Sequence, residues 1–179
     1  FELEIGIILS RSSKGPINIE NAEDHIFGFV LLNDWSARDV QGFSNILGPS
    51  LSKSFATSIS NYIVTKEALS PCMCKEVDYD FLKTPTYLQC PKSFYNINVS
   101  SEILIDENKY ELSTSNTKSF MWSPRQLLCA FSNNHVNFNA GDIIGTGTIS
   151  DENGKGCMLE LSHDGKLPIT LDSQTRKYI

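Results

Sequence analysis

The sequence predicts a mostly β domain with few helices, and three observations support this class. Apolar and polar residues alternate over 1–5, which is the two-residue period of a strand. The same alternation, interrupted by turn residues, predicts a hairpin within 94–113. A continuous apolar run over 26–32 is typical of a buried strand. Helices are expected only as short segments between these strands.

The first five residues predict a strand that carries two carboxylates on one face. Phe1, Leu3 and Ile5 alternate with Glu2 and Glu4, so both glutamates point the same way. Residues one strand period apart are separated by about 6.6 Å. At an effective dielectric constant of 20, two partly buried carboxylates at that distance repel by roughly 2.5 kcal/mol. A positive group is therefore expected between them.

The segment Asn33–Gln41 places polar side chains where a strand gives way to a helix. We expect Ser36 to be the N-cap of this short helix. Asp34 then lies at the end of the strand. Arg38 and Gln41 are three residues apart and share one face of the helix. This corner predicts a site in which a carboxylate faces a cation.

The rest of the chain carries strand patterns and a second clear helix start. Ser123 and Pro124 begin a helix that ends near Asn133, with Ser as cap and Pro at the first helical position. Residues 70–93 show no clear period and predict mostly loop. The other expected elements are a short helix over 19–25, a strand pair around 53–65, hairpin strands over 94–105 and 109–113, and two strands over 141–149 and 156–162 joined by a turn at 151–155.

Composition excludes several classes of function. Fifteen Lys and Arg against 21 Asp and Glu give a net charge of −6, which offers no electrostatic basis for binding nucleic acid or an anionic membrane. No apolar stretch approaches the roughly 20 residues that cross a bilayer, and no secretion signal opens the chain. Five irregularly spaced cysteines favour reduced thiols over a disulfide framework. A cytoplasmic enzyme with metal or small-molecule chemistry fits these bounds.

The motifs of the chain resemble the fumarylacetoacetase family. The resemblance begins in Asn33–Gln41 and continues, in the family's order and with family-like spacing, through the segments 47–57, 147–150, 158–161 and 174–177. Such collinearity over nearly the whole chain makes chance a poor explanation. It implies a catalytic domain with a mixed, roll-like β-sheet. Residues 1–179 are expected to form the central part of that domain, cut at both ends.

The resemblance implies metal ligands at Glu2, Glu4 and Asp34. Carboxylate oxygens are hard donors that suit Ca²⁺ and Mg²⁺. Lys53 and Thr57 match residues near a magnesium ion beside this site, and the lysine also faces the substrate. A fourth ligand, an aspartate, and a water-activating histidine are expected upstream of the first residue. Without the resemblance, a solvated polar face would be the better interpretation of the two glutamates.

The resemblance also implies catalytic and substrate-binding roles. Arg38, Gln41 and Lys53 match groups that stabilise the negative charge formed when a carbon–carbon bond beside a carbonyl is hydrolysed. Arg38, Gln41 and Thr148 match substrate contacts. Glu160, expected inside an apolar strand and partly buried, matches a glutamate that orients the histidine.

The implied reaction is hydrolysis of 4-fumarylacetoacetate, a diketo acid, to fumarate and acetoacetate in tyrosine and phenylalanine catabolism. The family also implies a homodimer. Two alternatives stay open: another superfamily member, such as an acylpyruvate hydrolase or oxaloacetate decarboxylase, and a catalytically silent metal-binding module. The silent module is favoured by residues 43–46, which lack the family's substrate-binding tyrosine. For Arg38, the alternative to a catalytic role is a purely structural ion pair with Asp34 or Asp39. Residues 1–179 alone are expected to be inactive.

Overall fold

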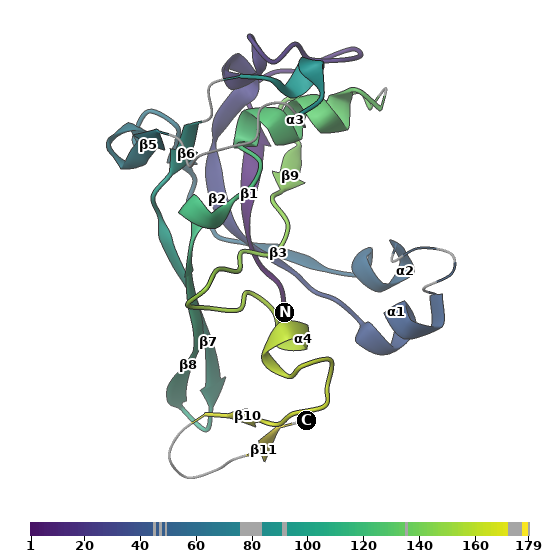
Figure 1. Cartoon of the computed structure of the whole chain (residues 1–179), viewed down its shortest axis with the longest axis vertical. Coiled ribbons are helices and arrows are strands. Elements are labelled where there is room, and N and C mark those ends of the chain that lie inside the picture. Colours follow the sequence, from purple (N-terminus) through teal and green to yellow (C-terminus); the bar gives the residue numbers. More distant parts are fainter. Residues whose placement is uncertain are drawn as a thin grey trace.

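The computed structural model describes the chain except for residues 45, 47, 49, 76–83, 91–92, 135, 172–176 and 179. Strands prevail, as the sequence predicts. The central sheet is antiparallel and has the order β3-β2-β1-β9, with β4 also pairing with β2 (Figure 1). Its strands are β1 (Leu3–Leu9), β2 (Ile26–Asp34), β3 (Thr57–Ile59), β4 (Val64–Thr65) and β9 (Ile143–Gly145).

Strand β1 lies at the centre of the fold, and all seven of its residues are buried. Its apolar side chains join those of β2 and of helix α3 (Pro124–Ser132) in one core that includes the fully buried Ile7 and Leu128. Glu4 is opposite Leu32 in the β1–β2 pairing. The charged end of β1 is therefore built onto a rigid, densely packed strand.

A long hairpin extends away from this sheet (Figure 1). It consists of β7 (Asn98–Ile105) and β8 (Asn108–Asn116). Its turn residues Asp106 and Glu107 have φ angles of 48° and 67°, the left-handed conformation that two-residue hairpin turns require. The predicted hairpin is confirmed, although its first strand is divided into β6 (Ser93–Tyr95) and β7.

The helices are short. An arm of α1 (Arg38–Ser44) and α2 (Ser50–Lys53) projects from the end of β2 (Figure 1). Helix α3 begins with a capping box, in which Ser123 and Gln126 exchange hydrogen bonds, so this predicted start is confirmed. The remaining elements are η1 (Ala22–His25), η2 (Ser70–Cys72), β5 (Met73–Lys75), η4 (Thr86–Leu88), η5 (Thr117–Ser119), α4 (Met158–Leu161), β10 (Ile169–Thr170) and β11 (Lys177–Tyr178).

Two local predictions are wrong. The segment 156–162 was expected to be a strand, but it contains helix α4, whose N-cap is Cys157. The segment Met158–Leu161 is too short for its apolar residues to show the period of a strand or of a helix, so tertiary contacts decide which of the two forms. Helix α1 begins at Arg38, and Ser36 does not cap it: the Ser36 hydroxyl donates to the carbonyl of Asp34 instead.

Other boundaries differ from the expectation. The predicted strand over 141–149 is limited to β9, and the region 53–65 begins in α2 before β3 and β4. Within 70–93, expected to be loop, β5 pairs with β6. Residues 76–83 and 91–92 of that expected loop lie outside the described part of the chain.

Candidate metal centre

Three carboxylates converge at one end of the central sheet. Glu2, Glu4 and Asp34 each place an oxygen within 4.8 Å of the others, and no other trio of His, Cys, Asp or Glu in the described residues does so. Asp34 ends β2, and its amide donates to the carbonyl of Glu2 at 3.2 Å. Residues opposite each other in an antiparallel pair share a face, which places all three side chains together. Glu2 and Glu4 are only 7% and 5% exposed.

Two basic side chains approach this cluster from the helical arm. Arg38 Nη2 lies 2.6 Å from Glu2 Oε1. Lys53 Nζ forms an ion pair with Glu2 Oε2 and lies 3.4 Å from Asp34 Oδ2. The expected positive charge is thus present beside Glu2, from both Arg38 and Lys53, whereas among the described residues Glu4 forms no ion pair.

Arg38 also binds Gln41, its neighbour on α1. Arg38 Nη1 donates to Gln41 Oε1 at 2.6 Å, which leaves the Nε2 amide group of Gln41 to donate elsewhere. The predicted shared face of Arg38 and Gln41 is therefore correct. Among the described residues Arg38 pairs with Glu2, so the alternative pairing with Asp34 or Asp39 is wrong.

The protonation of the two glutamates differs. Burial opposes ionisation of Glu2, but hydrogen bonds from Lys53 and Arg38 outweigh it and hold the pKa of Glu2 below its usual value. Burial raises the pKa of Glu4 to about 7, and the negative charges of Asp34 and Glu2 add to this rise. Without a cation, Glu4 therefore keeps its proton at pH values well above the ordinary pKa of a glutamate.

Two glycines that sequence reasoning did not include surround Glu4. The amide of Gly147 donates to Glu4 Oε2 at 3.0 Å. A Cβ atom at Gly145 would meet the same oxygen at 2.6 Å, so a larger residue there would displace this carboxylate. The sequence offers one signal for these positions, the pair of glycines on either side of Thr146.

The cluster fits a hard divalent cation. Its donors are carboxylate oxygens only, two of its three members are buried, and three carboxylates face the two positive charges of Lys53 and Arg38. Thr57, the register partner of Asp34, lines a cavity of about 250 Å³ together with Glu4 and Asp34. The structure thus brings the five predicted metal-site residues to one place, because Lys53 and Thr57 lie beside the three carboxylates.

Glu160 and Thr148 lie apart from the carboxylates. Glu160 is exposed on α4, so the expectation that it is buried in a strand is wrong. Its Oε2 atom accepts hydrogen bonds from Ser150 Oγ at 2.6 Å and Cys157 Sγ at 3.4 Å. Thr148 lines a separate cavity of about 200 Å³. The two regions are linked through the backbone, because Glu2 and Cys157 form a β-bridge.

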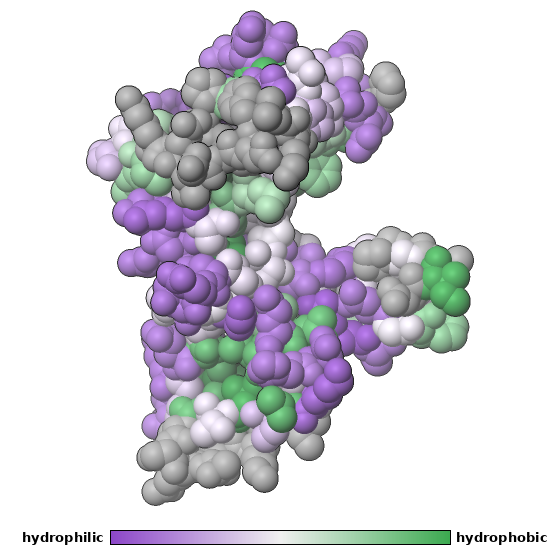
Figure 2. Space-filling model, viewed as in Figure 1, coloured by the Kyte–Doolittle hydropathy of each residue, from purple (hydrophilic) through white to green (hydrophobic). Residues whose placement is uncertain are grey.

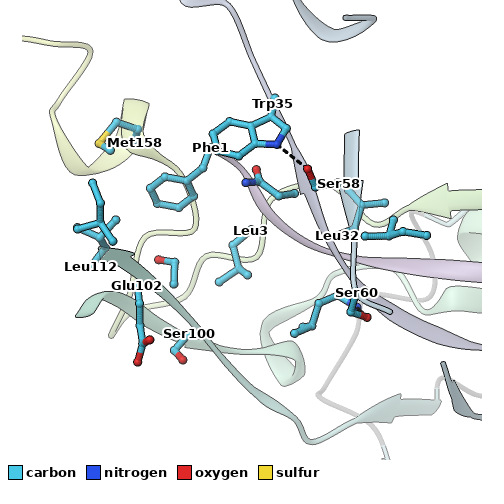
Figure 3. Close-up of a pocket in the computed structure, with 15 residues that line it drawn as sticks. Phe1, Leu3, Leu32, Trp35, Ser58, Ser60, Ser100, Glu102, Leu112 and Met158 are labelled. Atoms are coloured by element: carbon cyan, nitrogen blue, oxygen red, sulfur yellow. Dashed lines mark hydrogen bonds between the residues drawn. The ribbon is translucent and has the colours of Figure 1, made fainter. Parts of the chain in front are cut away.

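A larger cavity, of about 490 Å³, is mostly apolar and does not include the carboxylates (Figure 3). Phe1, Leu3 and Met158 contribute to it, with Trp35 at one side. The indole of Trp35 donates to Ser58 Oγ at 2.8 Å, which fixes its orientation (Figure 3). This cavity is therefore lined by none of the three clustered carboxylates, although it is larger than the cavity beside them.

A mostly β domain in which carboxylates, Arg and Lys meet at the end of a buried strand defines a candidate metal-binding catalytic domain. The family model for the C-terminal part of fumarylacetoacetate hydrolase matches residues 1–172. The chain belongs to the fumarylacetoacetate hydrolase family, as the motifs predicted.

Curated relatives agree with this assignment. The chain is 42% identical over 190 residues to fumarylacetoacetase of Dictyostelium discoideum, covering all of this chain and 44% of that protein. It is 38% identical over 187 residues to fumarylacetoacetase of Homo sapiens, covering 99% of this chain and 44% of that protein. The chain thus spans less than half the length of these relatives.

Solved structures share the fold. A fumarylacetoacetate hydrolase from Exiguobacterium antarcticum superposes with a TM-score of 0.60 at 21% identity, covering 96% of this chain and 48% of that one. A fumarylpyruvate hydrolase from Pseudomonas aeruginosa, in complex with Mn²⁺ and pyruvate, gives 0.58 at 17% identity, covering 87% and 55%. The predicted fold class is therefore confirmed.

Proposed function

We propose that the protein hydrolyses 4-fumarylacetoacetate to fumarate and acetoacetate. The observation that carries this proposal is the convergence of Glu2, Glu4 and Asp34 beside Arg38 and Lys53. Chain-long similarity to proteins named fumarylacetoacetase supports the choice of substrate. The proposal covers the natural full-length protein, because the chain spans only 44% of these relatives.

Glu2, Glu4 and Asp34 would hold a divalent cation, with Mg²⁺ and Ca²⁺ as the proposed ions. Such an ion, when bound, acts as a Lewis acid that polarises carbonyl oxygens. Lys53 and Thr57 are proposed to border a second, magnesium site next to the first. The position of Thr57 opposite Asp34 and the contact of Lys53 with the same aspartate support this placement. The Mn²⁺ complex of the Pseudomonas aeruginosa relative supports a divalent ion in general.

The arm residues supply donors for negative charge. Attack of water on a carbonyl carbon gives a tetrahedral oxyanion. Cleavage of the adjacent carbon–carbon bond leaves its electron pair on the acetoacetate carbon as an enolate, which then takes a proton. Arg38, Lys53 and Gln41 are proposed to stabilise these charges, and the Arg38–Gln41 hydrogen bond supports this because it uses the Gln41 oxygen and leaves the NH₂ group to donate.

Glu160 is proposed to orient the histidine that activates water, and Thr148 is proposed to contact the substrate. An ionised carboxylate beside an imidazole fixes the tautomer of the ring and favours its protonated form. The exposed position of Glu160 on α4 leaves its carboxylate accessible for such a partner.

The proposed setting follows from the same family assignment: a cytoplasmic homodimer in tyrosine and phenylalanine catabolism, with no nucleic acid or membrane partner. The net charge of −6 supports the absence of a nucleic-acid partner. Across the described residues, no helix has both the length and the apolarity needed to traverse a bilayer.

A comparison of substrates tests the proposal. The natural full-length protein is incubated with Mg²⁺ or Ca²⁺ and with fumarylacetoacetate, an acylpyruvate or oxaloacetate in turn. Highest kcat/KM for fumarylacetoacetate, with fumarate and acetoacetate formed in equal amounts, is the expected result. Decarboxylation of oxaloacetate alone would contradict the proposal. Metal binding without turnover of any substrate would instead identify a silent metal-binding module, the alternative that residues 43–46 favour.

A further inference from the structure

We propose that Ser150 is a positioning residue for Glu160, holding one carboxylate oxygen so that the other stays available to the group that Glu160 orients. This inference rests on the proposed catalytic role of Glu160. Neither the family motif nor sequence reasoning assigned a role to the Ser150 side chain. The evidence is the hydrogen bonding of the turn between Ser150 and α4.

The hydroxyl of Ser150 makes two hydrogen bonds with opposite roles. It donates to Glu160 Oε2 at 2.6 Å and accepts from the amide of Gly156 at 3.0 Å. Because the Gly156 amide occupies a lone pair of the hydroxyl oxygen, the proton of the hydroxyl is directed toward the carboxylate. A short bond from a neutral hydroxyl to an ionised carboxylate is among the stronger hydrogen bonds in proteins.

Both donors to Glu160 bind the same oxygen. The Cys157 thiol also donates to Oε2, at 3.4 Å. Within the described residues, no donor approaches Oε1. The carboxylate is therefore fixed through one oxygen, while the other remains able to accept a hydrogen bond.

The turn that carries Ser150 is itself tightly held. Asp151 accepts the amides of Asn153 and Gly154 at 2.7 Å and 2.9 Å. A Cβ at Gly156 would meet the carbonyl oxygen of Ile149 at 2.3 Å, so the chain can close this turn only with glycine. The position of the Ser150 hydroxyl is thus determined by the backbone.

The same turn is attached to the strand that bears the metal-centre carboxylates. The amide of Leu3 donates to the Gly156 carbonyl at 2.7 Å, and the amide of Ile149 donates to the Leu3 carbonyl at 2.9 Å. Leu3 lies between Glu2 and Glu4. The hydrogen bond from Ser150 therefore fixes Glu160 relative to the backbone of Leu3, the residue between two of the clustered carboxylates.

Variants of the natural full-length protein test this inference with fumarylacetoacetate as substrate. Ser150→Ala is expected to lower kcat by about tenfold or more, with KM changed by less than about twofold, because a misoriented carboxylate affects the transition state more than binding. Ser150→Thr, which keeps the hydroxyl, is expected to restore most of kcat. In Glu160→Gln, the added Ser150→Ala change is expected to have little further effect.

Ser162→Ala is the matched control. The Ser162 hydroxyl also donates to an oxygen, the Leu159 carbonyl at 3.4 Å, and accepts a glycine amide, that of Gly165 at 3.0 Å, but it does not touch Glu160. Its kcat is expected to equal that of the wild type. An equal loss of kcat in Ser162→Ala and Ser150→Ala would show a merely structural role and overturn the inference.

The remaining outcomes separate the inference from the function on which it rests. A low kcat in Glu160→Gln with wild-type kcat in Ser150→Ala would overturn the positioning role alone. A wild-type kcat in Glu160→Gln would remove the proposed role of Glu160, and the inference with it. A wild-type protein without turnover would overturn both.

Discussion

Arg38 binds the buried carboxylate of Glu2, with Nη2 lying 2.6 Å from Oε1. The same guanidinium donates to the side-chain oxygen of Gln41, so it connects the carboxylate cluster to the side-chain amide of Gln41 on α1. A planar guanidinium can make both contacts at once, whereas a lysine ammonium cannot reproduce its fixed geometry. The arm therefore depends on arginine at this position.

Arg38→Lys is expected to lower kcat/KM for fumarylacetoacetate by roughly tenfold to a hundredfold, the range for losing a hydrogen bond to a charged group. Arg11→Lys is the matched control, because Arg11 makes exposed contacts far from the proposed chemistry: an ion pair of 3.8 Å with Asp24 and a hydrogen bond of 3.0 Å from Nε to the Asp24 carbonyl. Steady-state kinetics measures both variants. Equal kcat/KM in Arg38→Lys and the wild type would contradict the assigned role.

Glu4 gives the metal-free protein a defined dependence on pH. Its folded-state pKa is raised from 4.5 to about 7, so between these pH values the folded state retains a proton that the unfolded state has lost. The free energy of unfolding therefore decreases as pH rises from 4.5 to 7 and the penalty is complete above 7. Thermal unfolding in a chelator, compared with Glu4→Gln, measures this contribution. A wild-type slope identical to that of Glu4→Gln over this interval would contradict it.

Gly145 is expected to be essential for the carboxylate cluster. Gly145→Ala places a methyl carbon 2.6 Å from the present position of Glu4 Oε2, so the carboxylate must move, and divalent-ion binding is expected to weaken by about tenfold or more. Gly42→Ala is the control, because a Cβ there meets nothing within 4 Å. Calorimetric titration with Mn²⁺ compares the two variants. Unchanged affinity in Gly145→Ala would show that Glu4 needs no such space.

The capping box of α3 is expected to contribute to stability and not to chemistry. Ser123→Ala removes the hydroxyl that accepts a hydrogen bond from the backbone amide of Gln126 at 3.4 Å. The free energy of unfolding is expected to fall by about 1 kcal/mol. Ser123→Thr keeps a capping hydroxyl and is expected to recover most of it. Urea denaturation measures the difference. A Ser123→Ala midpoint equal to that of the wild type would contradict this role.

Local signals explain which parts of the site could be predicted from sequence. The shared face of Glu2 and Glu4 and the strand-to-helix corner at Asp34 need only the period of each element. The meeting of all three carboxylates was implied by the family resemblance alone, because it depends on the pairing of β1 with β2. The arm places Arg38 and Gln41 at helical spacing, which also follows from the sequence.

Tertiary contacts explain what the sequence did not predict. Helix α4 forms around Glu160 because Cys157 caps it, while the apolar residues beside Glu160 suit a strand equally well. The requirement for glycine at Gly145 arises from Glu4, which is 141 residues away in the sequence and adjacent in space. Neither contact has a local pattern.

Metal titration of the natural full-length protein tests whether Glu2, Glu4 and Asp34 form one cation site. We expect Mn²⁺ to bind the wild type at pH 7.5, and Glu4→Gln and Asp34→Asn each to weaken this binding by about tenfold or more. Glu102→Gln, which changes an exposed carboxylate paired only with Lys109 at 3.8 Å, is predicted to bind as the wild type does. Equal Mn²⁺ affinity in all four proteins would contradict a single cation site built from Glu2, Glu4 and Asp34.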